Sequence, residues 1–392
     1  MPRRLPLSFA ILLASALLPA ALLESATARA GAPLTSAAPR PAAPIPAPPA
    51  LAAAPASTVT TPPAEQTTAT ALAPATAPPP ATTPAAARGR VRLVVQHAVG
   101  SPPAAIIGAQ IVVRGVVEPY VAGETVKVSF YRDGRKVEVR KIAPTPVGNG
   151  AAQFHLGFSS AVAGQVQARV VHYATPALAQ FSDRSPTVSF ASPNVSSGAR
   201  GPAVRVLQWE LNALHYVVPL DGLFDEATAR AVIAYRKVAG LELVPSTNTR
   251  LFRLLARGVG SFHVRFAGDG RHVEADLTRQ VLAEIAPHGR VLAIFTMSSG
   301  KPSTPTVIGR FRVYSKTPGV NAEGMVDSNY FIAGYAIHGY PEVPDYAASH
   351  GCLRVPIPNA ATIFSWVRIG TPVDVYHESG GGSHRINSHA GP

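Results

Sequence analysis

Ile337-His338-Gly339-Tyr340 opens the stretch of sequence around which the chain is organised. After a short loop the stretch continues with Ala348-Ser349-His350-Gly351-Cys352-Leu353-Arg354-Val355. It contains Cys352, the single cysteine of the sequence, with two histidines nearby. A thiol attacks as the thiolate, and a neighbouring imidazole is the usual means of forming one near neutral pH. The stretch therefore predicts a Cys/His nucleophile pair, and spacing alone permits either His338 or His350 as the base.

Two other interpretations of Cys352 agree less well with its neighbours. A lone cysteine is often a small buried hydrophobic residue, but Gly351 and the polar Ser349 and His350 stand directly before it and argue against that. A metal site formed by His338, His350 and Cys352 is disfavoured, because structural zinc uses four closely spaced ligands and the sequence has no second cysteine. We therefore expect neither a metal nor an organic cofactor.

The run Ser349-His350-Gly351-Cys352-Leu353-Arg354, preceded by Ile337-His338-Gly339, resembles the L,D-transpeptidase catalytic domain, also called YkuD, of bacterial cell-wall enzymes. A second element of that family lies upstream, in Ser299-Gly300-Lys301 and Thr304-Pro305-Thr306-Val307-Ile308-Gly309-Arg310-Phe311. The resemblance covers residues 261–377. It implies a β-sandwich-like domain that carries the cysteine on the rim of a cleft.

The resemblance also implies roles for the site residues. Cys352 is the expected nucleophile and His338 the expected general base and acid, with the main-chain carbonyl of Gly339 orienting its imidazole. Ser349, His350 and Gly351 are expected to shape the turn, and the N–H groups of Gly351 and Cys352 to stabilise an oxyanion. Arg354 is expected to position either a substrate carboxylate or the loop itself.

Apolar residues alternate at Val273, Ala275 and Leu277, and further short apolar runs separated by Gly289, Gly300 and Pro305 follow. Alternation of this kind is typical of strands, so the domain at 261–377 is predicted to be mostly β.

Residues 196–258 are predicted to form three helices. Their apolar stripes begin after Gly201-Pro202 and after Asp225, and they end near Gly240 and Gly258. The phrases Gly201-Pro202-Ala203-Val204, Leu207-Gln208, Leu211-Asn212-Ala213-Leu214, Asp221-Gly222-Leu223-Phe224 and Thr228-Ala229 resemble the type 1 peptidoglycan-binding domain. The leucines themselves are expected to be core residues.

Residues 89–193 are predicted to form an immunoglobulin-like β-sandwich with a spacer or docking role. Val126, Val128 and Phe130 alternate before the turn signal Asp133-Gly134. No set of catalytic residue types appears in this region.

The N-terminal residues 1–30 combine Arg3 and Arg4 with an apolar run and a small-residue cleavage site, and this predicts a signal peptide. An uncleaved membrane anchor is the alternative. Residues 31–88 are rich in Pro, Ala and Thr and are predicted to be a disordered linker. Residues 378–392 are predicted to be a flexible tail, and His377, His384 and His389, in or beside it, to be unstructured.

The formal net charge of the chain is +13. For an exported protein this favours anionic wall polymers or acidic lipids as partners, rather than nucleic acid. Taken together, the sequence predicts a mainly β, multidomain, secreted L,D-transpeptidase of the cell wall or periplasm, monomeric and acting on peptidoglycan stem peptides and glycan. An L,D-carboxypeptidase and a non-catalytic wall-binding protein are the alternatives.

Overall fold

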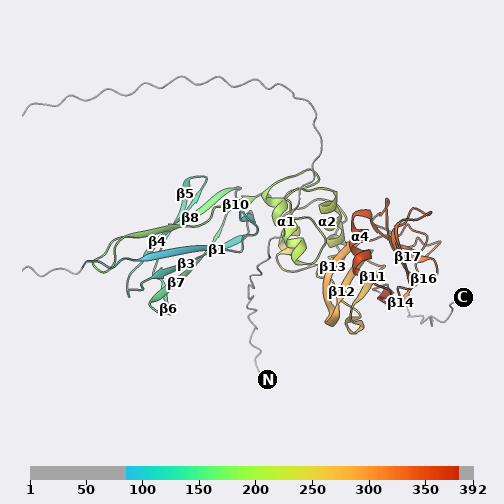
Figure 1. The fold of residues 1–392 in the computed structure, drawn as a ribbon. Helices are drawn as coiled ribbons and strands as arrows, with labels where there is room; N and C mark the ends of the chain where they lie inside the picture. The colour runs from blue at the N-terminus through green and yellow to red at the C-terminus, as the bar shows by residue number, and fades with distance from the viewer. Residues whose placement is uncertain (1–84, 379–392) are drawn as a thin grey trace, which may run out of the picture. The chain divides into compact units, whose positions relative to one another are not determined.

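The computed structural model describes residues 85–378 (Figure 1). The predicted signal peptide, almost all of the predicted linker and the predicted tail after residue 378 lie outside these residues. Strands dominate the described part of the chain, and its helices are few. The predicted fold class, mainly β with a small helical unit, is confirmed.

The first region is a sandwich of two sheets. One sheet has the order β1-β3-β7-β6 and the other the order β2-β10-β8-β4-β5, with β9 also paired to β8. The strands are β1 (Arg90–Gln96), β2 (Ala104–Ile106), β3 (Gln110–Glu118), β4 (Val126–Arg132), β5 (Arg135–Ile142), β6 (Thr145–Gly148), β7 (Ala151–Ser159), β8 (Gly164–His172), β9 (Phe181–Arg184) and β10 (Val188–Ala191). Phe130 of β4 stacks on Phe158 of β7 with their ring centroids 4.5 Å apart, so the two sheets pack face to face.

The turn between β4 and β5 forms where the sequence predicts it. Asp133 and Gly134 both have positive φ angles, 49° and 79°, and Arg132 pairs directly with Arg135. Two central residues with positive φ define a type I′ turn, which suits the twist of a hairpin. The alternation of Val126, Val128 and Phe130 likewise places these three side chains in the core.

Three helices follow, as predicted: α1 (Pro202–Ala213), α2 (Glu226–Val238) and α3 (Thr249–Leu255). The side chain of Asp225 accepts a hydrogen bond from the N–H of Thr228 and caps α2, and Asn248 caps α3 in the same way. Lys237, near the end of α2, is buried and donates to Thr296 Oγ1 at 2.9 Å, in the domain that follows.

That last domain contains two further sheets. The first, β13-β12-β11-β19-β14, consists of β11 (His272–Asp276), β12 (Val281–Ala286), β13 (Arg290–Thr296), β14 (Gly309–Arg312) and β19 (Pro372–Tyr376). The second, β15-β16-β17-β18, consists of β15 (Ser315–Val320), β16 (Val326–Ile332), β17 (Tyr335–Tyr340) and β18 (Leu353–Pro356). Short 3-10 turns (Ala267–Asp269 and Pro287–Gly289) and helix α4 (Ile357–Trp366) complete it. Nothing in the sequence predicted α4.

Strand β11 is buried along its whole length, whereas a half-buried strand exposes every second side chain. Val273 and Ala275 are buried as expected, but His272, Glu274 and Asp276 between them are buried as well. The Glu274 carboxylate accepts from the N–H groups of Arg265 and Phe266 and from the Tyr376 hydroxyl at 3.0 Å. These bonds allow a charged side chain to stay inside a sheet that is covered on both faces.

Two expectations at the edges of the domains need correction. The predicted linker extends to residue 88, but Ala87 already forms a bridge with Leu178 of the sandwich region. His377 was expected to be unstructured, yet its carbonyl accepts a hydrogen bond from Arg265 at 3.0 Å, directly after β19. His384 and His389 lie outside the described residues. No helix within residues 85–378 is long and apolar enough to cross a membrane.

Candidate active site

The site is built on the parallel pair β17 and β18. Their register places His338 directly opposite Arg354, and Ile337 opposite Leu353. Cys352 directly precedes β18, so the strand pairing brings it beside Ala336, two residues before His338 on β17. The long loop between the two strands supplies Ser349, His350 and Gly351.

A single open cavity of about 740 Å³ is lined by His338, Ser349, His350, Cys352 and Arg354. The structure thus brings together five of the seven residues selected from the sequence. The remaining two, Gly339 and Gly351, adjoin lining residues in the chain. Tyr330, Tyr335, Tyr340, Glu323, Met325, Ala333 and Gly334 complete the wall.

His338 is buried, and its Nδ1 lies 3.0 Å from the carbonyl oxygen of Gly339. Because a carbonyl only accepts, Nδ1 carries the proton in this contact, and the neutral ring presents Nε2 as an acceptor. Burial lowers the pKa of His338, and the positive charge of Arg354 lowers it further, while the Gly339 carbonyl opposes both. The resting imidazole is therefore neutral near pH 7.

Cys352 is half-buried, and its Sγ lies 3.8 Å from the carbonyl oxygen of Gly334. Burial raises the pKa of the Cys352 thiol, against the lowering effects of the Ala336 N–H and of Arg354. A raised thiol pKa beside a lowered imidazole pKa favours the neutral pair over a thiolate–imidazolium pair. This arrangement suits proton removal by the base during attack.

His350 has a different environment from His338. It is exposed, and its Nε2 lies 3.1 Å from Nζ of Lys301. The ammonium group can only donate, so this contact uses the acceptor nitrogen of the His350 ring. His350 is thus held at the mouth of the cavity, at the turn where the sequence places it.

In this structure the Gly351 N–H, one of the two expected oxyanion donors, donates to Ser349 Oγ at 3.1 Å. The Ser349 hydroxyl in turn donates to the Cys352 carbonyl at 2.6 Å. Position 351 requires glycine for two reasons. Its φ is 121°, which residues with a Cβ rarely adopt, and a Cβ there would lie 1.7 Å from Cε1 of Tyr335. Among the hydrogen bonds of residues 85–378, none uses the N–H of Cys352, which leaves it as the donor from this turn.

Arg354 stacks over the ring of Tyr340, with its guanidinium carbon 3.9 Å from the ring centroid. Its backbone is held on the other side, where it exchanges two hydrogen bonds of 2.9 and 3.0 Å with Ser298. The guanidinium therefore remains as a fixed positive charge in the wall of the cavity.

The upstream element Ser299-Gly300-Lys301 lies directly against the loop that carries the cysteine. The carbonyl of Ser299 accepts from the N–H groups of Ala348 and Ser349, both at 2.9 Å. Thr306 Oγ1 accepts from the Gly300 N–H and donates to the Gly351 carbonyl, each at 2.8 Å. The two separated sequence elements form one hydrogen-bonded unit.

Sequence reasoning assigned no role to Thr306 or to Gln280. Gln280 is buried and has a positive φ of 55°; its side chain accepts from the Ser299 N–H at 2.8 Å and donates to Ser299 Oγ at 2.8 Å. For Thr306, its position inside the upstream element was the available signal. For Gln280 the sequence contained no such signal, because its partner Ser299 comes close only when the sheet has formed.

No group of three or more His, Cys, Asp or Glu side chains within residues 85–378 is arranged to hold a metal ion. The cavity residues present a thiol, an imidazole and a guanidinium, which together suit nucleophilic acyl transfer.

Comparison with known sequences assigns two parts of the chain. Residues 270–375 match the family described as the L,D-transpeptidase catalytic domain (YkuD), and residues 200–244 match a peptidoglycan binding domain family. The curated L,D-transpeptidase 1 of Mycobacterium tuberculosis is 32% identical over 112 residues, which are 23% of this chain and 45% of the relative. The chain thus spans less than half the length of that relative.

Among solved structures, an L,D-transpeptidase fragment from Xylanimonas cellulosilytica is 33% identical and covers 47% of this chain and 98% of its own, with a TM-score of 0.45. An L,D-transpeptidase from Stackebrandtia nassauensis is 19% identical and covers 49% of this chain and 100% of its own, with a TM-score of 0.31.

Proposed function

Since residues 270–375 form an L,D-transpeptidase catalytic domain, we propose that this protein is an exported L,D-transpeptidase that forms 3-3 cross-links in peptidoglycan. Its substrate is a tetrapeptide stem that ends in D-alanine, and the intermediate is a thioester on Cys352. The observation that carries the proposal is the cavity in which the half-buried Cys352 thiol and the buried, oriented His338 imidazole share one wall.

The first half-reaction follows from the protonation states of the pair. The thiol proton moves to Nε2 of His338 as Sγ attacks the carbonyl carbon of the third stem residue. The negative charge that develops on the carbonyl oxygen is stabilised by the N–H of Cys352, and Arg354 adds a favourable field. When the C–N bond breaks, His338 donates its proton to the departing D-alanine amine, and the thioester remains.

The second half-reaction reverses these roles. The side-chain amine of a neighbouring stem attacks the thioester and gives a proton to His338. The C–S bond then breaks, a new amide forms, and His338 returns the proton to the Cys352 sulfur. One peptide bond is exchanged for another, so no cofactor or external energy source is needed.

His338 is favoured as the base over His350. Its Nδ1 is engaged by the Gly339 carbonyl, which fixes the ring and leaves Nε2 as the acceptor. In His350 the acceptor nitrogen Nε2 contacts Nζ of Lys301 instead, and the ring is exposed. In the proposed mechanism His350, Ser349 and Gly351 form the turn that carries the nucleophile.

The remaining regions serve the same substrate in this proposal. Residues 200–244, the peptidoglycan binding match, hold the enzyme on the wall. Residues 1–30 direct export, residues 31–86 act as a tether, and the sandwich serves as a spacer or docking module. The protein then works in the cell wall or periplasm as a monomer.

Intact-protein mass spectrometry after mixing the protein with disaccharide-tetrapeptide tests the proposal. The wild type is expected to gain a covalent adduct, release D-alanine and accumulate dimers, whereas Cys352→Ala does none of these. His350→Ala serves as the matched control and should still form the adduct. Release of D-alanine without dimers would establish an L,D-carboxypeptidase instead. Binding without adduct or release would leave a non-catalytic wall-binding protein.

A further inference from the structure

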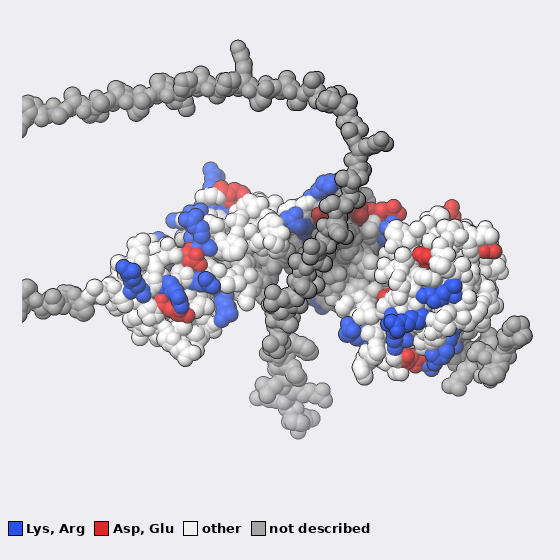
Figure 2. Space-filling view, in the orientation of Figure 1, with Lys and Arg blue, Asp and Glu red and all other residues white. Residues whose placement is uncertain are grey.

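The outward side of one sheet of the sandwich carries a cluster of positive charges. Val126, Val128 and Phe130 of β4 point into the core, so Lys127 and its cross-strand neighbours point outward. The registers of β9, β8, β4 and β5 place five basic residues on this side, which we term the cationic face: Lys127, Lys136, Lys141, Arg169 and Arg184. In the view of Figure 2 the sandwich, at the left, shows more Lys and Arg than Asp and Glu on its visible surface.

Like charges stand directly opposite one another on the cationic face. Arg169 pairs in register with Arg184, and Lys127 pairs with Lys141. Like charges directly across two strands destabilise the sheet. None of the ion pairs found within residues 85–378 involves any of the five residues. The acid of β5, Glu138, is in register with Phe130 and therefore on the other side, where it pairs with Arg140.

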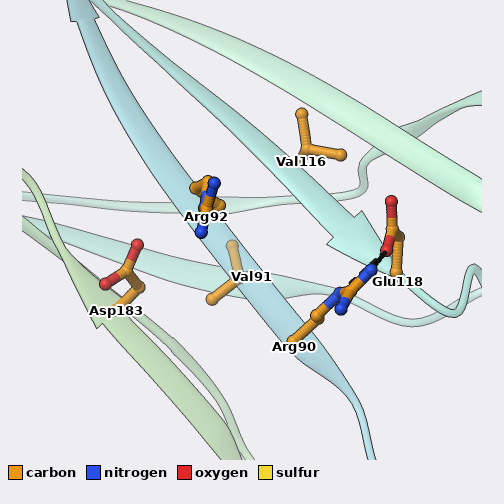
Figure 3. Close-up of a pocket in the computed structure, with 6 residues that line it drawn as sticks. All are labelled: Arg90, Val91, Arg92, Val116, Glu118 and Asp183. Carbon is orange, nitrogen blue, oxygen red and sulfur yellow. Dashed lines mark hydrogen bonds and ion pairs between the residues drawn. The ribbon is translucent and has the colours of Figure 1, made fainter.

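The second sheet of the sandwich shows the ordinary arrangement. There Arg90 of β1 is in register with Glu118 of β3, and the two side chains form an ion pair (Figure 3). Both residues line a pocket to which Asp183, of β9 in the other sheet, also contributes, and Asp183 accepts a hydrogen bond from the Leu93 N–H at 2.8 Å. Opposite charges are thus matched on one sheet and like charges are set together on the other.

Aromatic rings hold several of these cations against the cationic face. The guanidinium of Arg169 lies 4.2 Å from the ring centroid of Tyr131, and Lys136 Nζ lies 5.7 Å from the same centroid. Lys127 Nζ lies 5.6 Å from the Tyr173 ring and donates to its hydroxyl at 3.4 Å. Such contacts reduce the freedom of long side chains, and so lower the entropy lost when a ligand binds.

We propose that the cationic face binds a linear polyanion, a polymer with closely spaced phosphate or carboxylate groups. The band of cations crosses four strands, about 15 Å at the usual strand spacing, which is room for several anionic groups in line. A polyanion would neutralise both like-charge pairs at once. An acidic membrane is less suited, because the outward residues of these four strands include no Trp, Phe or Leu to insert into lipid.

This inference stands apart from the proposed catalytic function, because the five residues lie in the sandwich and the chemistry belongs to residues 270–375. Its test uses the purified full chain with sodium polyphosphate and with polygalacturonate as probes, and titrates each at several salt concentrations. Polyphosphate and polygalacturonate distinguish phosphate from carboxylate polymers.

The test variant combines Lys127→Gln, Lys141→Gln, Arg169→Gln and Arg184→Gln. Affinity for the preferred polymer is expected to fall at least about tenfold at low salt, with a shallower dependence on salt concentration. The matched control combines Arg88→Gln, Arg90→Gln, Arg92→Gln and Arg114→Gln, which removes the same charge outside the cationic face. The control should lose less than about twofold. The melting temperature of the test variant should be no lower than that of the wild type, because repulsion is relieved.

Equal losses in the two variants would overturn the proposal in favour of net charge alone, and so would retained affinity in the test variant. Vesicles of anionic phospholipid provide the remaining arm. Tighter binding to these vesicles than to either polymer, lost in the test variant, would replace the polymer with a membrane surface. Binding is measured without turnover, so failure of the catalytic proposal would leave the result readable.

Discussion

The hydroxyl of Thr306 donates to the carbonyl of Gly351 at 2.8 Å, and it accepts from the N–H of Gly300 at the same distance. One side chain thereby joins the upstream element to the residue directly before the nucleophile. Because all three groups are buried, their hydrogen bonds cannot be replaced by water without rearrangement.

Thr306→Val should loosen the turn that carries Cys352 while keeping its shape. The change leaves a buried N–H and a buried carbonyl unpaired, at a cost of about 1–3 kcal/mol in the free energy of unfolding. D-alanine release should fall by about tenfold or more, mainly in kcat, because the nucleophile is misplaced.

Thr304→Val is the comparison variant, since Thr304 Oγ1 donates to the Ser349 carbonyl at 3.2 Å from a half-buried position. We expect a smaller loss there. Equal kinetics for Thr306→Val and the wild type would show that the link to Gly351 is not needed. Urea unfolding measures the change in the free energy of unfolding, and assays of D-alanine release on the same preparations measure the change in activity.

The pH dependence of acylation should have an acid limb set by His338. Burial holds the pKa of His338 below its usual 6.5, so the neutral base is present at pH 7 and is lost as the pH falls through that lowered pKa. Burial raises the pKa of the Cys352 thiol, so the reactive form on the plateau of the pH profile is the neutral thiol beside the neutral imidazole. Single-turnover adduct formation measured from pH 4 to 9 gives this profile.

Arg354→Gln should move the acid limb to higher pH, because the positive charge that opposes the imidazolium is removed. Lys301→Gln changes a positive charge beside His350 rather than beside His338, and should leave the limb in place. A rate that declines as His338 loses its proton would instead indicate a thiolate–imidazolium pair.

Gly351→Ala should abolish most activity. The new Cβ would overlap the Tyr335 ring, and the backbone φ of 121° is strained for any residue with a Cβ. Displacement of Cys352 by about 1 Å is enough for a loss of about 100-fold. Gly268→Ala, where a Cβ meets no atom within 4 Å, is the matched substitution and should be neutral in assays of adduct formation.

Glu284 of β12 should make the stability of the catalytic domain fall as the pH rises. Burial raises the pKa of Glu284 to about 8, and Oε1 has no hydrogen-bond partner among the described residues. The unfolded chain ionises this group near 4.5. Its protonated form therefore contributes fully below pH 4.5, and the contribution is lost between pH 4.5 and about 8.

Glu284→Gln keeps the shape and removes the titration, so its stability should exceed that of the wild type by on the order of a few kcal/mol at pH 8 and by little at pH 4.5. Thermal unfolding across this range measures the difference. Glu242→Gln, at an exposed position, should follow the wild type. Parallel curves for Glu284→Gln and the wild type would contradict the assignment.

Several features of the fold could be predicted because they depend on neighbours in the sequence. The Asp133-Gly134 turn needs only residues that accept positive φ, and Asp225 caps α2 through an N–H three residues away. The apolar periods predicted the sandwich strands and the three helices. Helix α4 was missed, because it follows β18 directly within a region of strand-like apolar runs.

By itself the sequence determined the chemistry available to this protein: one thiol, nearby imidazoles and a glycine before the nucleophile are fixed by residue type and short-range spacing. Tertiary structure decided how they are used. The pairing of β17 with β18 sets His338 opposite Arg354 in a buried wall, while His350, closer to Cys352 in sequence, is exposed. The pKa shifts and the like-charge pairs of the cationic face arise the same way. Each depends on burial or on strand register, which are set only when distant segments pack.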